Sequence, residues 1–134
     1  MAYKIHNIGI AAQTGDCSDA VETCSNVRWL LTSGTPGLQM NGELPSDIAG
    51  QADLAWKHIL RMLGRAEMTI ANVVKVTQYL TRDQDIPAYF KVRTRFLGDA
   101  APASTLLVVP QLARPEFLVE VEIIAAKAES KEGE

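Results

Sequence analysis

The chain has 134 residues, of which 47% are hydrophobic and 22% are charged, and its formal net charge is -3. This length is typical of one domain, and the composition is that of a globular protein with a buried core. No block of lysine or arginine occurs, which argues against binding to a phosphate backbone. We therefore expect a single domain over residues 1–127, a charged flexible tail over 128–134, and no nucleic-acid partner.

The sequence also argues against membrane and metal binding. The N-terminus lacks the apolar run of a signal peptide, and no apolar segment is long enough to cross a bilayer. The spacing of Cys17 and Cys24 fits neither a redox pair nor a zinc site. We therefore expect a cytoplasmic protein with both thiols reduced, no metal, no cofactor and no membrane partner.

Short apolar or alternating stretches predict several strands. In chain order they cover residues 3–10 and 20–23, which are the weaker pair, and then 28–33, 73–80, 105–109 and 117–126. A loop over 38–44 precedes the first helix and carries an Asn41-Gly42 turn signal.

The first predicted helix begins at Pro45-Ser46-Asp47. Ser46 is placed to cap free N–H groups, and Asp47 lies where the helix dipole favours an anion. From Ile48 to Met62, apolar residues recur every three or four positions and form one stripe. Gly64 is expected to end this helix.

The second predicted helix begins near Asp85-Ile86-Pro87, where a proline in the first turn costs no hydrogen bond. Tyr89, Val92 and Phe96 are expected to face inward. The helix is expected to end at Leu97-Gly98.

The strand patterns also bear on assembly. Strict alternation in 117–126 places Val119 and Val121 on one face and Glu120 and Glu122 on the other. The strands over 73–80 and 105–109 carry apolar residues on both faces, and two helices cover only one face. We therefore expect further copies of the chain to cover the second face, in a homo-oligomer.

Five segments carry a family resemblance through their order and spacing: 30–34, 42–52, 73–80, 102–109 and 117–126. Together they resemble the RidA (YjgF) family of small trimeric enamine and imine deaminases. The resemblance implies a chorismate-mutase-like α+β fold, with a mixed β-sheet and two helices packed on one face. It also implies a homotrimeric barrel with a small-molecule pocket at each of the three subunit interfaces.

The same resemblance implies hydrolysis of an imine, the tautomer of an enamine, to a ketone and ammonia. In the family an arginine binds the substrate carboxylate, and a glutamate positions the attacking water. The glutamate corresponds to Glu122, and the glycine after the first full strand corresponds to Gly34. The arginine position is Ser104, which offers one neutral donor, so we expect a changed specificity.

Other pocket positions of the family also differ in this chain. On the second helix the asparagine position is Phe90 and the tyrosine position is Arg93. The substrate-binding candidates are thus Gly34, Phe90, Arg93, Ser104 and Thr105. Arg93 either takes over the role of the lost arginine, or extends to solvent or pairs with a carboxylate of a neighbouring subunit.

Three functions remain open at this point. The first is a RidA-like hydrolase or deaminase that acts on an imine, enamine or related C–N small molecule through water activated by Glu122, the catalytic candidate. The second is a non-catalytic trimer that binds a small metabolite or a partner in its interface clefts, with Glu120 and Glu122 solvated or in salt bridges between subunits. The third is an RNA-directed activity, which the acidic composition disfavours.

Overall fold

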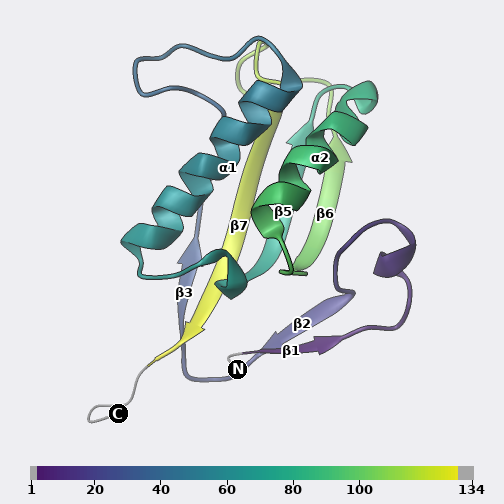
Figure 1. Ribbon diagram of the computed structural model, residues 1–134, viewed down its shortest axis with the longest axis vertical. Coiled ribbons are helices and arrows are strands. Elements are labelled where there is room, and N and C mark those ends of the chain that lie inside the picture. The colour runs from purple at the N-terminus through teal and green to yellow at the C-terminus, as the bar shows by residue number, and fades with distance from the viewer. Residues whose placement is uncertain (1–2, 130–134) are drawn as a thin grey trace.

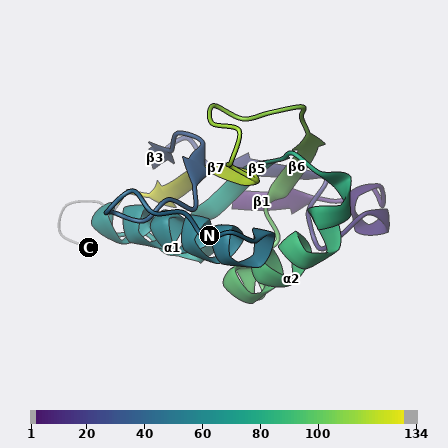
Figure 2. The ribbon, with the colours of Figure 1, turned by 90° about the horizontal axis from the view of Figure 1, so that it is seen from above.

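The computed structural model describes residues 3–129, which fold into a layer of strands and a layer of two helices (Figure 1). The main sheet has five strands in the order β3-β7-β5-β6, with β4 also paired to β7, and β1 and β2 form a separate two-stranded sheet. The strands are β1 Tyr3–His6, β2 Ala20–Thr23, β3 Val27–Leu31, β4 Thr35–Pro36, β5 Val73–Leu80, β6 Ala103–Val108 and β7 Val119–Ala128, and the helices are α1 Ile48–Arg65 and α2 Ile86–Leu97. Both helices lie on the same side of the main sheet (Figure 2).

Helix α1 is amphipathic and packs its apolar stripe against the sheet. Its N-cap is Asp47, whose carboxylate accepts a hydrogen bond from the backbone N–H of Gly50 at 3.1 Å. The cap predicted at Ser46 is therefore wrong by one residue, because the extended backbone of Asp47 brings its own side chain to the free N–H groups. The helix ends at Arg65, one residue beyond the predicted stop at Gly64.

Helix α2 follows its prediction closely. Pro87 lies in the first turn, and Gly98 ends the helix with a φ of 55°, a conformation that favours glycine. Tyr89 and Val92 are buried as expected. Phe96 is partly buried and stacks on Trp56 of α1, with the ring centroids 6.2 Å apart.

Strand β7 is the centre of the main sheet. It runs antiparallel to β3, β4 and β5, whereas β5 and β6 are parallel, so the sheet is mixed as predicted. Val119, Val121 and Ile123 are at most 2% exposed and face the helices, which confirms the predicted alternation. The strand continues through Ala128, one residue into the predicted tail, and residues 130–134 of that tail lie outside the described residues.

The predicted strand over 3–10 is shorter than expected and ends at His6. Beyond it, the N–H groups of Ile8, Gly9 and Ala11 donate to the carboxylate of Asp19 instead of to a neighbouring strand. These backbone hydrogen bonds, with that of Ala11 the strongest, lower the pKa of Asp19. They shape the loop between β1 and β2, which lies beside the main sheet (Figure 1).

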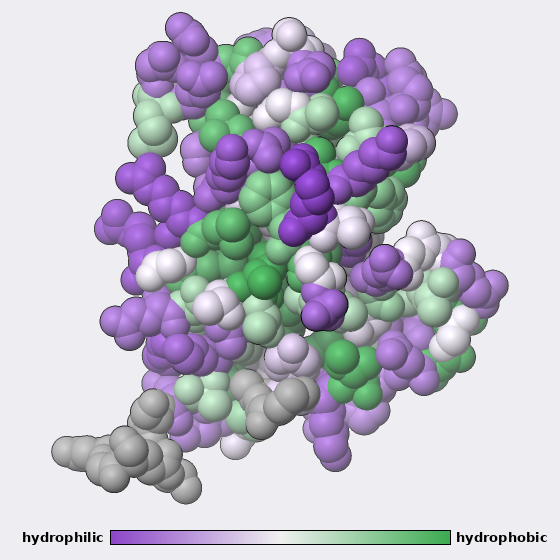
Figure 3. Space-filling model, viewed as in Figure 1, coloured by the Kyte–Doolittle hydropathy of each residue, from purple (hydrophilic) through white to green (hydrophobic). Residues whose placement is uncertain are grey.

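The two faces of the main sheet differ in their covering. The helical side carries many hydrophilic side chains on its outside (Figure 3). On the face without helices, Trp29 is 54% exposed and Leu31 is 67% exposed, with Leu107 at 39%. These apolar side chains belong to the surface that the strand pattern predicted to be covered by other copies of the chain.

Within residues 3–129, no helix is long and apolar enough to cross a membrane. The same residues contain no group of three or more His, Cys, Asp or Glu side chains arranged to hold a metal ion. Cys17 and Cys24 are both free thiols.

Candidate functional site

Three of the predicted substrate-binding residues line one cavity of about 280 Å³. Phe90 and Arg93 come from α2, where their spacing of three places them on the same side of the helix. Ser104 comes from β6, the last strand of the sheet order. The cavity is completed by Thr14, Gly15, Cys17, Ile86 and Leu106. The segment before β2 therefore forms its third side.

Arg93 is the charged group of this cavity, and it is only 2% exposed, so it does not extend into solvent. Its Nε donates to Oε1 of Gln78 at 2.8 Å, and its Cζ lies 5.3 Å from the centre of the Phe90 ring. Among residues 3–129 no carboxylate lies within ion-pair distance of this guanidinium. Burial lowers the pKa of Arg93, and the nearby Tyr89 opposes that shift.

Gln78 of β5 is hydrogen-bonded to residues of both α2 and β6, the two elements that supply Arg93 and Ser104. Its Oε1 accepts hydrogen bonds from Arg93 and from the hydroxyl of Tyr89 at 2.7 Å. Its Nε2 donates to Oγ of Ser104 at 3.1 Å and to the carbonyl of Thr105 at 2.9 Å. Gln78 is fully buried, and these four bonds use both ends of its amide.

The catalytic candidate Glu122 lies on the opposite face of the sheet. The Tyr79 hydroxyl donates to its Oε1 at 2.5 Å, and this bond raises the pKa of Tyr79. Glu120 lies on the same face, where burial and then the charge of Glu122 raise its pKa. Gly34 lies against this group, since a side chain there would overlap the carboxylate of Glu120.

The predicted site residues thus form two groups within one chain. Ser104 faces the helices beside Gln78, whereas the neighbouring Thr105 faces the other side and accepts a hydrogen bond from Lys75 Nζ at 2.7 Å. The strand register places Thr105 and Glu122 on either side of Thr77. The chain therefore brings Phe90, Arg93 and Ser104 together on one face, and Gly34, Glu122 and Thr105 on the other.

Four further residues of the two groups are not predicted as site residues from the sequence: Gln78, Tyr79, Tyr89 and Cys17. A signal for Gln78 existed in the alternation of β5, which places it between the buried Val76 and Leu80. A glutamine on the apolar face of a central strand needs hydrogen-bond partners, and that requirement marks a polar network.

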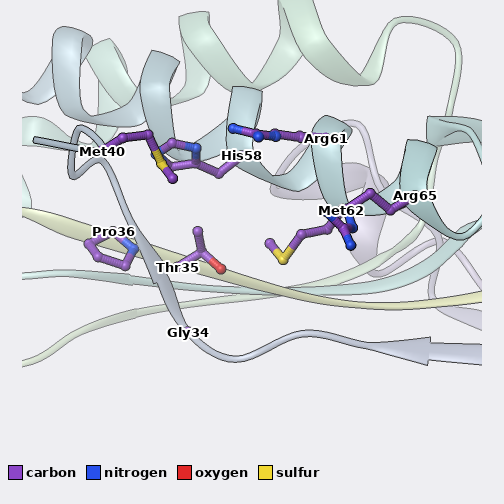
Figure 4. Close-up of a pocket in the computed structure, with 8 residues that line it drawn as sticks. All are labelled: Gly34, Thr35, Pro36, Met40, His58, Arg61, Met62 and Arg65. Carbon is purple, nitrogen blue, oxygen red and sulfur yellow. The ribbon is translucent and has the colours of Figure 1, made fainter.

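A second cavity, of about 410 Å³, lies between α1 and the segment after β3 (Figure 4). Helix α1 supplies His58, Arg61, Met62 and Arg65, and the segment supplies Gly34, Thr35, Pro36 and Met40. Nε2 of His58 lies 2.7 Å from the carbonyl oxygen of Leu38, which ties the loop to the helix. Of the predicted site residues only Gly34 borders this cavity, so the smaller cavity is the better candidate.

Both the sequence and the fold are similar to those of known proteins. Residues 11–127 match the family model described as Endoribonuclease L-PSP. RutC family protein PM1466 of Pasteurella multocida is 30% identical over 133 residues, which cover 96% of this chain and 100% of that protein. The crystal structure of the conserved Rid family protein YyfB from Yersinia pestis superposes with a TM-score of 0.82 at 26% identity, covering 95% of this chain and 100% of that one.

Escherichia coli TdcF, which carries the provisional description of a reactive intermediate deaminase, has a crystal structure with bound serine. It superposes with a TM-score of 0.70 at 24% identity over 75% of this chain and 81% of that one, a likeness of fold alone. The YyfB structure agrees with the fold described above, and the family model and the full-length relative agree with it in sequence. The chain belongs to the RidA (YjgF) family.

Proposed function

We propose that this chain is a RidA-type hydrolase or deaminase that acts on an imine, an enamine or a related small molecule with a C–N bond. Glu122 accepts a proton from water as the water oxygen bonds to the imine carbon and the C=N electron pair moves to nitrogen. Return of this proton to nitrogen gives a carbinolamine. Transfer of its hydroxyl proton to nitrogen, with Glu122 as the carrier, then breaks the C–N bond as the C=O bond forms, which releases ammonia and leaves a ketone. A general base of this kind contributes about 10²–10⁴ to the rate.

The geometry of Glu122 carries this proposal. Its Oε1 is held by the Tyr79 hydroxyl. No hydrogen-bond partner of Oε2 occurs in the described part of the chain, so this oxygen is available to a water molecule. The absence of a side chain at Gly34 lets the carboxylate of Glu120 lie against the backbone there, on the same face as Glu122.

The complete site needs a second copy of the chain. Glu122 and the Ser104 cavity lie on opposite faces of one sheet, so one chain cannot present both to the same small molecule. We propose a homotrimer in which the Glu122 face of one copy meets the Ser104 cavity of the next, with a ligand cleft at each interface. The exposed Trp29 and Leu31 on the face without helices support such an assembly.

Ser104 supports a changed specificity. The family resemblance places an arginine at this position, and Ser104 supplies a neutral hydroxyl that already accepts a hydrogen bond from Gln78. Phe90 and Leu106 make the cavity apolar around it. The bound molecule therefore differs in shape and contacts from the usual small imino acid, although the serine in the TdcF structure agrees with a small ligand.

The test is ammonia release from imines generated in situ, both carboxylated and neutral, with purified protein. We expect release above the buffer rate, and about a 100-fold or larger loss in Glu122→Gln. Glu43→Gln is the matched control, since Glu43 is exposed in the loop before α1. A Glu122→Gln variant as active as the wild type would contradict the mechanism.

A trimer that binds a metabolite without converting it is the second candidate. The mostly apolar lining with few polar groups favours it, because this mixture is typical of small-molecule binding pockets. Saturable binding with no ammonia release from any imine would establish it. RNA cleavage that survives rigorous purification would instead support the third, RNA-directed activity.

A further inference from the structure

We infer that Arg93 is a preformed receptor for the carboxylate of the molecule that occupies the 280 Å³ cavity, and that Gln78 is the residue that positions it. The inference rests on the proposed function only in taking this cavity as the ligand site. It assigns the recognition of charge to α2, away from the strand position at which the family resemblance expects an arginine.

The first support is the burial of an unpaired charge. Arg93 is 2% exposed, and none of the acidic groups in residues 3–129 forms an ion pair with it. A buried cation without a paired anion is costly. Asp16 favours the charged form of Arg93 only from beyond ion-pair distance, so the guanidinium still lacks a direct anionic partner, which a ligand can supply. The cavity beside Arg93 is the place where that anion can bind.

The second support is the way in which the guanidinium is held. The Nε of Arg93 donates to Oε1 of Gln78 at 2.8 Å, and the Phe90 ring lies against one face of the guanidinium. No acceptor for Nη1 or Nη2 occurs among the described residues. Neither atom is fully buried. Among the described residues, the fully buried side-chain nitrogen without a hydrogen-bond partner is Trp56 Nε1, and the Nη atoms of Arg93 are not in that class. The two Nη groups therefore reach the cavity, with the paired donors that a carboxylate accepts.

The third support is the fixed orientation of Gln78. Its Nε2 donates to Ser104 Oγ and to the Thr105 carbonyl, so its Oε1 has to face Arg93. Tyr89 donates to the same Oε1 and holds it from the other side. Arg93 is thus aimed before any ligand arrives, which reduces the entropy lost on binding.

The lining defines the rest of the ligand. Ser104 Oγ accepts from Gln78, so its own O–H is free to donate to the bound molecule. Phe90, Ile86 and Leu106 supply apolar surface next to the guanidinium. This combination fits a small carboxylic acid with an apolar or aromatic body.

The test compares benzoate with benzamide, which share a shape and differ in charge. Binding of each probe to the purified protein is measured by isothermal titration calorimetry. We expect benzoate to bind about tenfold or more tightly than benzamide, and we expect Arg93→Gln to remove this preference. Arg61→Gln is the control, since Arg61 is an exposed arginine of the other cavity and its loss should change neither affinity.

Gln78→Glu tests the positioning role with a side chain of the same size. Its carboxylate would pair with Arg93, so benzoate should lose its advantage while benzamide binding changes little. A purely structural role for Gln78 would weaken both probes equally. Arg93→Lys, which keeps the charge without the paired donors, should show an intermediate preference and serves if Arg93→Gln does not fold.

Two outcomes would overturn the inference. One is a wild-type protein that binds benzoate no more tightly than benzamide, or binds neither. The other is an Arg93→Gln variant that keeps its native mass in solution and still prefers benzoate over benzamide. Neither depends on turnover, so a protein that prefers benzoate and releases no ammonia would remove the proposed activity and leave the receptor intact.

Discussion

At the scale of single residues, Gly34 has no room for a side chain, because an added Cβ would overlap the carboxylate of Glu120. In contrast, an added Cβ at Gly64 in α1 meets no atom within 4 Å. The two glycines therefore have different effects. Gly34 makes room for the carboxylate of Glu120, whereas Gly64 makes α1 less stable than an alanine would.

This difference predicts opposite effects of two Gly→Ala substitutions. Gly34→Ala should displace Glu120 and lower ammonia release by about tenfold or more, since a shift of about 1 Å near a site has large effects on rate. Gly64→Ala should keep the activity and raise the free energy of unfolding by about 0.5–1 kcal/mol. Activity assays and urea unfolding check both, and an active Gly34→Ala variant would show that Glu120 is not close to the reaction.

The raised pKa of Glu120 predicts how the stability of the protein depends on pH. Its pKa is raised in the folded protein by burial and then by the charge of Glu122, so the folded state holds its proton more tightly than the unfolded state. Stability is then lost as the pH rises from the unfolded pKa of 4.5 through the raised folded pKa. Glu120→Gln should therefore stabilise the protein at pH 7 and have no such effect below the unfolded pKa.

The size of that gain should stay below about 1 kcal/mol, because Glu120 is half-buried and solvent screens its charge. Thermal melts of both proteins at pH 7 and at pH 4 measure it. Equal differences at the two pH values would mean that burial does not disfavour the charged form of Glu120.

Part of the candidate site could be predicted from the sequence alone. Phe90, Arg93 and Ser104 were predicted together, and the structure places them in one cavity. The orientation of Arg93 could not be predicted, since it depends on Gln78, which is distant in sequence and becomes a neighbour only through the packing of α2 on β5. The separation of Ser104 from Glu122 across the sheet likewise depends on strand register, which no local pattern reveals.

At the scale of elements, hydrophobic periodicity placed both helices to within a residue or two. It could not decide which polar residue caps α1, because Ser46 and Asp47 are both good N-caps and only the backbone geometry selects one. Strand ends were less accurate, as at His6, beyond which backbone N–H groups donate to the Asp19 carboxylate instead of to a neighbouring strand. The pairing of β5 with β6 and β7 also required the tertiary structure.

The cap of α1 can be tested with two adjacent substitutions. Asp47→Ala removes the bond to the Gly50 N–H and should lower the free energy of unfolding by about 1 kcal/mol. Ser46→Ala should have an effect close to zero, since Ser46 does not cap the helix. Chemical unfolding of the two variants checks this, and a larger loss in Ser46→Ala would restore the original prediction.

At the scale of the whole molecule, the face of the main sheet without helices exposes Trp29 and Leu31 in one row, on the same strand. Exposed apolar surface of this kind marks an interaction site. Two helices already cover the other face (Figure 2). The face without helices is therefore the surface on which the proposed trimer depends.

We expect the double variant Trp29→Ser and Leu31→Glu to dissociate the trimer, because a charge would replace apolar contact in the interface. Leu60→Glu is the control: Leu60 is 39% exposed on α1, in the helical layer. Light scattering after size exclusion gives the mass of each. A monomeric wild type would contradict the assembly, and an unchanged double variant would place the interface elsewhere.

Ser104 and Thr105 are consecutive residues whose side chains leave β6 on opposite sides. One of them belongs to the surroundings of Arg93, and the other to the face that carries Glu122. Substitution of Ser104 can therefore change the surroundings of Arg93 without disturbing Glu122, the carboxylate that we propose as the base. Changes at Ser104 can thus alter the ligand while Glu122 is kept. Changes at Glu122 can remove the proposed reaction while the cavity around Ser104 is kept.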